Sequence, residues 1–300
     1  MAMLKIKKSL RRSGFKEPVQ MAGIMMLFII GVVTFPTQWI VELFYKGGDE
    51  LVLRMADGIT RLIFSVMMLY FIGNFGFRVI PRKTHIIDLL VVIPALIIAV
   101  NNFPFVAYIN GDCSLTEDAG GIIMFAVWCI GVGLFEEISF RGVILPLTLI
   151  FLKDKKRPVF FTIAVSSAVF ALTHLVNLFS GNIGGTILQV GYTFLIGAMC
   201  GIVTVKTGNV FISALVHIVY NFCGMLVEYC GKGVMWTWPQ IICTAVVGVI
   251  IGVVMIVIAV RSDNSPENVF NMLGEDDLPE VADSEDAATE NESNTTENNV

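Results

Sequence analysis

Charged residues are scarce in this sequence of 300 residues, in which 15% of the side chains are charged and 55% are hydrophobic. This composition excludes a soluble globular domain as the main part of the chain and is typical of an integral membrane protein. Histidine is also rare, with three residues in all. The six cysteines include no C-x-x-C pair, so their spacing does not support a thiolate metal site.

Acidic residues are few outside the carboxy-terminal end. Twelve of the 25 follow Arg261, and residues 1–260 therefore hold 19 basic residues against 13 acidic ones. The basic amino-terminal arm adjoins an apolar segment, where it suits an anionic membrane surface. The charge distribution therefore leaves no case for nucleic acid as a partner.

Long apolar segments are abundant instead. Eight of them approach or exceed the ~20 residues that a bilayer crossing needs: residues 21–45, 57–77, 86–109, 119–150, 158–179, 185–205, 209–230 and 236–260. The sequence therefore predicts an all-α fold, a polytopic membrane helix bundle of about eight transmembrane helices in a lipid bilayer.

Lysine and arginine indicate the orientation, because these residues in short loops stay on the cytoplasmic side. Fifteen of the 20 lie in the amino-terminal arm, in the even-numbered loops or just after the last span. The opposite loops hold only Lys46 and Lys232. Both termini are therefore expected in the cytoplasm, and the membrane is the cell membrane if the source is bacterial.

The domain organisation follows from these patterns. Residues 1–17 form a basic cytoplasmic arm, and residues 18–261 form the transmembrane domain. Residues 262–300 form an acidic tail with few large apolar residues, which is expected to be disordered. Cys113 and Cys230 fall in loops assigned to the outer side, and a disulfide between them is left open.

Polar residues inside the apolar segments form three patterns, each pairing positions four residues apart on one helix face. They are Glu136-Glu137-x-x-x-Arg141, Phe170-x-x-x-His174 and His217-x-x-x-Asn221. An ionisable side chain at membrane depth normally faces a protein interior or a wet cavity and marks a functional site. Carboxylates, imidazoles and a carboxamide together suggest a hydrolytic centre.

The spacing also predicts depth. Glu137 and His174 lie 16 and 17 residues from the basic turn between their helices, ~25 Å along each helix axis. They should therefore lie at one level. His217 lies only ~16 Å from its own loop, so it fits if the first two helices project into the cytoplasm, with a kink or break at Pro146.

The two carboxylates are expected to differ in role. Glu137 and Arg141 share a helix face and should form a salt bridge. Glu136 points ~100° away on the same helix, so it is free to act on water as a general base or to bind a metal. The structural alternative is two acids that flank a kinked helix near the headgroups.

The two intramembrane imidazoles are candidates for metal ligands or proton donors, whereas the third histidine, His85, lies in a basic loop. Asn221 shares a face with His217 and can donate a hydrogen bond to a developing oxyanion. Phe170 is expected to be a wall that keeps the pocket dry. Taken singly, His174 also suits a packing role and Asn221 an interhelical hydrogen bond.

In this order, Glu-Glu-Ile-Ser-Phe-Arg-Gly (136–142), Phe-Ala-Leu-Thr-His (170–174) and His-Ile-Val-Tyr-Asn (217–221) resemble the three motifs of a known family. It is the CPBP family, the CAAX prenyl proteases and bacteriocin-processing enzymes, also called Abi. The resemblance covers residues 120–225. It implies an intramembrane endopeptidase in which Glu136 activates water beside His174, with His217 and Asn221 supporting the oxyanion.

The resemblance leaves two mechanisms open. The family is commonly described as metal-dependent, but a metal-independent glutamate mechanism is also discussed for it. Glu136, His174 and His217 would suit a catalytic site for a divalent metal, in the first place Zn²⁺, with one position open for water.

The leading hypothesis is therefore a peptide hydrolase that acts on a peptide or protein substrate at the cytoplasmic leaflet, either a membrane-anchored precursor or a lipidated carboxy terminus. One alternative is a non-catalytic scaffold that regulates a partner membrane protein. The other is an ion-coupled transporter, which the absence of a recognisable internal repeat disfavours.

Overall fold

The computed structural model describes residues 18–35, 37–79, 86–264 and 267–273. These residues are mostly helical, in the order α2 (Pro18–Val33), α3 (Thr37–Glu42), α4 (Glu50–Phe75), α5 (Ile86–Leu89), α6 (Val92–Asn101), α7 (Phe105–Ile109), α8 (Ala119–Ser139), α9 (Leu145–Leu152), α10 (Pro158–Thr173), α11 (Ile183–Thr207), α12 (Val210–Cys230), α13 (Trp238–Ser262) and α14 (Glu267–Phe270). A π-helical segment, η1 (Phe140–Ile144), joins α8 to α9, and two 3₁₀ segments are η2 (His174–Ser180) and η3 (Asn271–Leu273). Strands β1 (Cys113–Leu115) and β2 (Gly231–Gly233) pair antiparallel, with Cys113 opposite Gly233.

Six helical runs within the described residues are long and apolar enough to cross a membrane. They are Glu50–Phe75, Ala119–Leu152, Pro158–Phe179, Ile183–Thr207, Val210–Cys230 and Trp238–Ser262. The prediction of a helical integral membrane protein is confirmed, but the count of eight continuous spans is not. The cytoplasmic position of both termini stays a prediction.

The two remaining apolar segments are divided into shorter helices. In the segment 21–45 the chain leaves helical geometry at Thr34 and Phe35, immediately before a proline in the sequence. In the segment 86–109, α6 ends at Asn101 and Pro104 precedes α7. The residue before a proline disfavours α-helical geometry and proline donates no hydrogen bond, so hydropathy alone overestimates the length of these helices.

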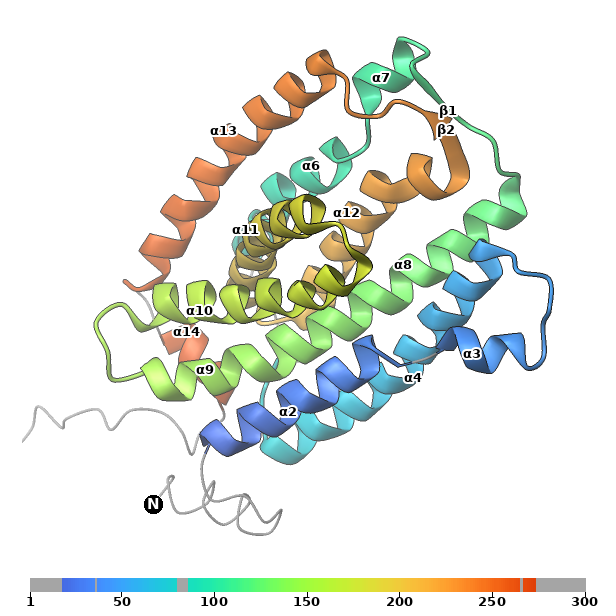
Figure 1. Cartoon of the computed structure of the whole chain (residues 1–300). Helices are drawn as coiled ribbons and strands as arrows, with labels where there is room; N and C mark the ends of the chain where they lie inside the picture. Colours follow the sequence, from blue (N-terminus) through green and yellow to red (C-terminus); the bar gives the residue numbers. More distant parts are fainter. Residues whose placement is uncertain (1–17, 36, 80–85, 265–266, 274–300) are drawn as a thin grey trace, which may run out of the picture.

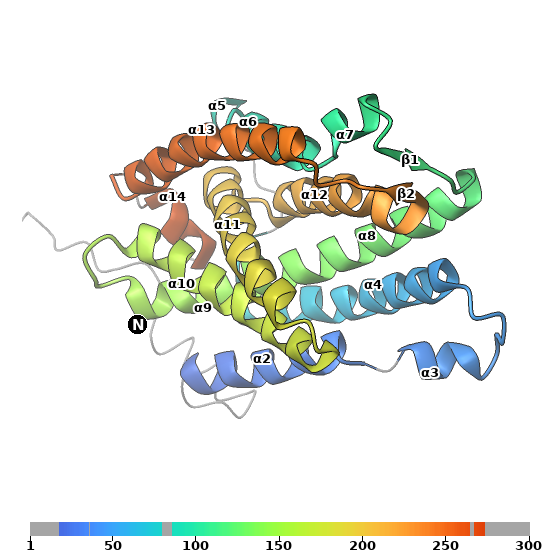
Figure 2. The same cartoon turned by 45° about the horizontal axis from the view of Figure 1, so that its top comes forward.

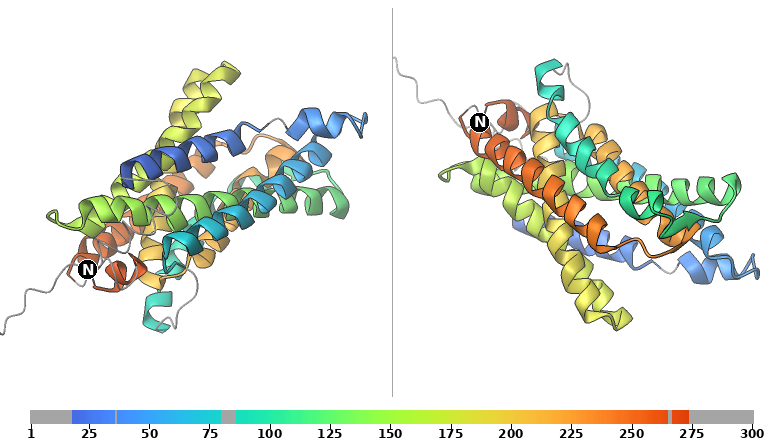
Figure 3. Two further views of the ribbon diagram at one scale, coloured as in Figure 1. Left: turned by 90° about the horizontal axis from the view of Figure 1, so that it is seen from below. Right: turned by 90° about the horizontal axis from the view of Figure 1, so that it is seen from above.

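The helices pack in layers. Figure 2 shows α6 and α13 on one side of the bundle, α2 and α4 on the opposite side, and α8, α10, α11 and α12 between them. α4 runs alongside α8 (Figure 1). The start of α11, which follows η2, projects beyond the other helices (Figure 3). Helices α8, α10, α11 and α12 contribute to one cluster of buried apolar residues, and each of the three motifs has at least one buried member: Glu137, Phe170 and His217.

Glycine permits the close contact between α4 and α8. A Cβ atom on Gly58 would lie 2.6 Å from the Cα of Trp128, and one on Gly131 would overlap the backbone of Gly58. Backbone atoms cannot move aside as the end of a flexible side chain can. Small residues at this crossing therefore let the two helices approach, as is usual between membrane helices.

We expect Gly131→Ala to lower the free energy of unfolding by about 1–3 kcal/mol, because the added methyl group forces α4 and α8 apart. Thermal unfolding in detergent would measure the change. Gly248→Ala on α13 is the matched control, since a Cβ there meets nothing within 4 Å. Equal unfolding temperatures for the two variants would contradict the role given to this contact.

All six cysteines are free thiols, so the disulfide left open for Cys113 and Cys230 is absent. The two residues belong to different apolar clusters. Cys113 packs with Ala107 and Val227, whereas Cys230 packs with the cluster around Phe125. The short β1–β2 ladder, and not a covalent bond, joins these loops.

The tail is ordered further than its composition predicts. Residues 267–273 form α14 and η3, and four of their apolar side chains are buried: Val269, Phe270, Met272 and Leu273. The expectation of disorder from residue 262 onward is therefore wrong for this segment, because its few apolar residues are consecutive enough to pack. The predicted basic arm, residues 1–17, and the acidic residues 274–300 lie outside the described residues.

Candidate active site

Helix α8 carries the two carboxylates into the core and then continues through a distortion. Beyond Glu137 the backbone widens into the π-helical segment η1, in which the N–H of Leu145 donates to the carbonyl of Phe140. Pro146 follows in the first turn of α9. A proline removes one helical hydrogen bond and collides with the carbonyl four residues earlier. The wide turn accommodates both effects, so the helix continues where a kink or break was expected.

Glu137 and Arg141 form the predicted ion pair, with Nη1 of Arg141 2.9 Å from Oε1 of Glu137. Both are buried, at 0% and 1% exposure. Nη2 of Arg141 donates to the carbonyl of Gly197 on α11 at 2.8 Å. The guanidinium carbon lies 4.7 Å from the centre of the Phe170 ring on α10. The buried ion pair therefore links the segment that follows α8 to α10 and α11.

His217 on α12 completes the network. Its Nδ1 lies 2.8 Å from Oε1 of Glu137, and because a carboxylate only accepts, Nδ1–H is the donor. Its Nε2 then faces Oε2 of Glu136 at 3.6 Å. Gly133 allows α12 this close, since a Cβ there would lie 2.6 Å from the side chain of Ile218.

His217 contacts Glu137 directly, so the predicted convergence of these two motifs is confirmed. The projection of the first two helices into the cytoplasm, on which the predicted depths depended, stays a prediction.

Accessibility separates the two carboxylates. The side chain of Glu136 is 12% exposed, whereas that of Glu137 is fully buried. Glu137 already accepts from His217 and pairs with Arg141. Glu136 is therefore the more accessible of the two carboxylates, and Glu137 orients its neighbours.

His174 lies at the junction of α10 and η2 and is partly buried. Its Nδ1 is 3.3 Å from the carbonyl oxygen of Phe170, which can only accept, so Nε2 is left without a proton in the neutral ring. The Phe170 ring packs edge-on against both imidazoles, with centroid distances of 5.1 Å to His174 and 5.9 Å to His217. Phe170 itself is buried, as expected for an apolar wall.

Asn221 lies one turn after His217 on the same helix and is partly buried. Within the described part of the chain its side chain forms no hydrogen bond. Its amide N–H groups are therefore available to another acceptor, which distinguishes it from an asparagine that serves only to join helices.

A metal would have to use groups that the core already orients. Among the described residues, one group of three His, Cys, Asp or Glu side chains has its ligand atoms within 4.8 Å of one another. It consists of Glu137, Cys200 and His217, and this buried group could hold a metal. The predicted set of Glu136, His174 and His217 does not gather within that distance. Glu136 and His217 alone are close enough, at 3.6 Å, to share one ion with bonds of ~2.0 Å.

The Arg141 charge argues against an ion between Glu137 and Cys200. The guanidinium lies 2.9 Å from the same carboxylate oxygen that accepts from His217, so a cation there would meet a buried like charge. Nε2 of His217, the ring nitrogen that does not contact Glu137, lies 3.6 Å from Oε2 of Glu136, and these two atoms fit a metal better.

The sequence analysis did not identify Gly197 and Cys200 as members of the site. The carbonyl of Gly197 accepts from Arg141, and a Cβ on Gly197 would lie 3.1 Å from Nη2 of Arg141. Cys200 lies in the group around Glu137. Gly197 and Gly201 have the small-x-x-x-small spacing that signals a close helix contact, but this spacing does not say which residue the partner helix presents.

The comparison with known families agrees with the motifs. Residues 118–223 match the model of the Rce1-like family, described as type II CAAX prenyl endopeptidase. This range runs from the start of α8 into α12 and contains all three motifs. No curated protein and no solved structure matches the chain. The resemblance expected over residues 120–225 is therefore confirmed.

Proposed function

Because residues 118–223 form an Rce1-like domain, and the type II CAAX prenyl endopeptidases are intramembrane proteases, we propose that this protease hydrolyses a peptide bond in a membrane-associated or lipidated precursor. The reaction takes place at the cytoplasmic leaflet. Glu136 is the general base, and His174, His217 and Asn221 act around it. Glu137 and Arg141 are positioning residues.

One observation carries this proposal: Glu136, the less buried of the two carboxylates, faces an imidazole whose orientation is set by a buried ion pair. The Nδ1–H of His217 is committed to Glu137, which leaves Nε2 directed toward Glu136. A carboxylate and a basic nitrogen that face the same space suit the polarisation of a water molecule. The orientation is prepared before substrate arrives, because the ion pair lies in the protein core.

The proposed chemistry uses these groups in two steps. Glu136 takes a proton from water as the water oxygen attacks the scissile carbonyl carbon. The resulting oxyanion accepts hydrogen bonds from Asn221, whose amide has no other partner among the described residues. Protonated Glu136 then gives the proton to the amide nitrogen, and the carbon–nitrogen bond breaks. Phe170 keeps bulk water from the site, which strengthens each electrostatic contact.

A divalent metal such as Zn²⁺ would be held by Glu136 and His217, whose facing atoms lie 3.6 Å apart. When bound it would lower the pKa of a coordinated water toward ~7. Glu136 can act on water with or without an ion. Metal analysis of the purified active protein, together with chelator treatment, distinguishes the two cases: loss of turnover that Zn²⁺ restores supports the metal form.

We expect His174→Ala to reduce cleavage of a membrane-anchored peptide by about 10²-fold or more, because a group that moves or holds a proton is lost. Gel analysis of substrate and product in detergent would measure it. His85→Ala is the matched control, since this histidine lies outside the three motifs. Turnover at the wild-type rate in His174→Ala would refute the role of His174. Absence of cleavage by the wild-type protein itself would favour the non-catalytic scaffold as the alternative.

A further inference from the structure

A groove separate from the candidate active site runs along the outside of the bundle between α6 and α13. Its volume is about 580 Å³, which is within the range of small-molecule sites. Six apolar residues of the two helices line most of it: Ile93, Pro94, Ile97, Ile251, Val254 and Ile258. Only 6% of the most apolar stretch of α13 is buried, so this helix faces the lipid phase.

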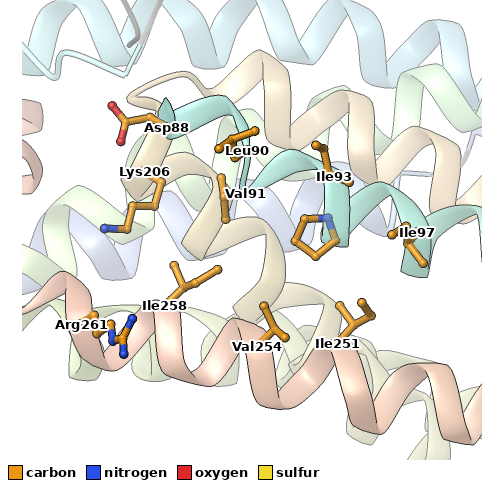
Figure 4. A pocket seen from close by; sticks show the side chains of 11 residues that line it. Asp88, Leu90, Val91, Ile93, Ile97, Lys206, Ile251, Val254, Ile258 and Arg261 are labelled. Atoms are coloured by element: carbon orange, nitrogen blue, oxygen red, sulfur yellow. The ribbon is translucent and has the colours of Figure 1, made fainter. Parts of the chain in front are cut away.

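The charged side chains of the groove gather at one end. Figure 4 shows Asp88, Lys206 and Arg261 at this end, with Ile97 and Ile251 at the other. Lys206 lies in the last turn of α11 and Arg261 in the last turn of α13, at the level predicted for the cytoplasmic headgroups. Neither basic side chain forms a hydrogen bond or ion pair with the described residues.

We propose that this groove binds an anionic phospholipid, with an acyl chain between α6 and α13 and the phosphate between Lys206 and Arg261. Basic pockets between membrane helices on the cytoplasmic side are suited to anionic headgroups. With Asp88, the three charges sum to +1, which one phosphodiester neutralises. The groove does not contain any residue of the three motifs, so binding is independent of the proposed proteolysis.

The shape of the groove favours a lipid over a soluble anion. The cations lie at the mouth of an apolar channel that faces the bilayer, so a soluble phosphate would leave that channel without a partner. An acyl chain fills it and removes apolar surface from contact with the disordered lipid around it. A zwitterionic lipid offers the same chain but no net charge for the basic end.

The test is lipid binding to the purified full chain in detergent, measured by native mass spectrometry with phosphatidylglycerol and with phosphatidylcholine. Phosphatidylglycerol should bind more tightly. The variant K206Q/R261Q should bind it about thirtyfold less tightly. Each basic residue contributes about 1 kcal/mol to the binding of an anionic lipid, and the loss of both corresponds to this change in Kd. K155Q/K156Q is the matched control, because it removes the same charge from exposed residues on the same predicted side.

A second pair of variants tests the apolar part without changing charge. Val254→Trp should fill the groove and weaken phosphatidylglycerol binding, whereas Val257→Trp, equally exposed on α13 but outside the lining, should not. Equal binding by K206Q/R261Q and the wild type, or equal affinity for the two lipids, would overturn the proposal. Full displacement of the lipid by soluble glycerol 3-phosphate would also overturn it and indicate a site for a soluble anion.

Discussion

Glu136→Gln is expected to lower the rate of peptide hydrolysis by about 10²–10⁴-fold, the usual effect of removing a general base. Glutamine keeps the size of the side chain but cannot take a proton from water. The fold should not change, because Glu136 lies 3.6 Å from His217, beyond an ordinary hydrogen bond, and is the less buried of the two glutamates. Single-turnover cleavage of a membrane-anchored peptide would measure the loss.

Glu228→Gln is the matched control for this experiment. It makes the same chemical change at an exposed position of α12, away from the motifs. Its rate should equal that of the wild type. Wild-type turnover in Glu136→Gln itself would remove Glu136 from the mechanism. The reaction would then need a base other than Glu137, because Glu137 is already paired with Arg141 and His217.

Arg141→Met is expected to lower the free energy of unfolding by about 3–5 kcal/mol, because it leaves Glu137 as an uncompensated charge in the protein interior. Glu137 is fully buried, and Arg141 is the cation beside it. Methionine preserves much of the volume, so the loss reports the charge and not a large cavity. Thermal or denaturant unfolding in detergent would measure it.

The double variant E137Q/R141M separates charge from packing. Replacing both partners removes the unpaired charge, while the glutamine oxygen still accepts from Nδ1–H of His217. Stability should therefore recover most of the loss seen in Arg141→Met. If the double variant is no more stable than the single one, the contacts of Arg141 with Gly197 and Phe170 supply the stabilisation instead.

The two experiments address different parts of one network. Glu136→Gln removes the group that reacts with water and should leave the core unchanged, whereas Arg141→Met weakens the core. If Glu136→Gln loses turnover at full stability and Arg141→Met loses stability, the chemical role belongs to Glu136 and the positioning role to the ion pair.

The glutamate motif could be interpreted from the sequence because its contacts are local. Glu137 and Arg141 are four residues apart on one helix, so helical periodicity alone predicts their ion pair, which the structure contains. Hydropathy similarly predicts the membrane class. Where proline interrupts an apolar segment, as at Pro104, hydropathy overestimates the length of the helix. The reason is that hydropathy does not depend on whether a residue has a backbone N–H donor.

The contacts between helices required the tertiary structure. His217 and Glu137 are separated by 80 residues, and Arg141 and Gly197 by 56. The motifs predicted that His217 lies near the carboxylates. They did not show which carboxylate accepts a hydrogen bond from which ring nitrogen. The involvement of Cys200 and the groove at Lys206 and Arg261 likewise depend on how oblique helices cross.

By itself, the sequence determined that this chain is a helical membrane protein, that three polar motifs belong to one centre, and that Glu137 pairs with Arg141. Only the tertiary structure decided that Glu136 keeps access to the site, that His217 is oriented by Glu137, and where α6 and α13 leave a groove. The physical reason is range: helical periodicity relates residues within a few turns, whereas crossing angles and packing between distant segments decide which side chains meet.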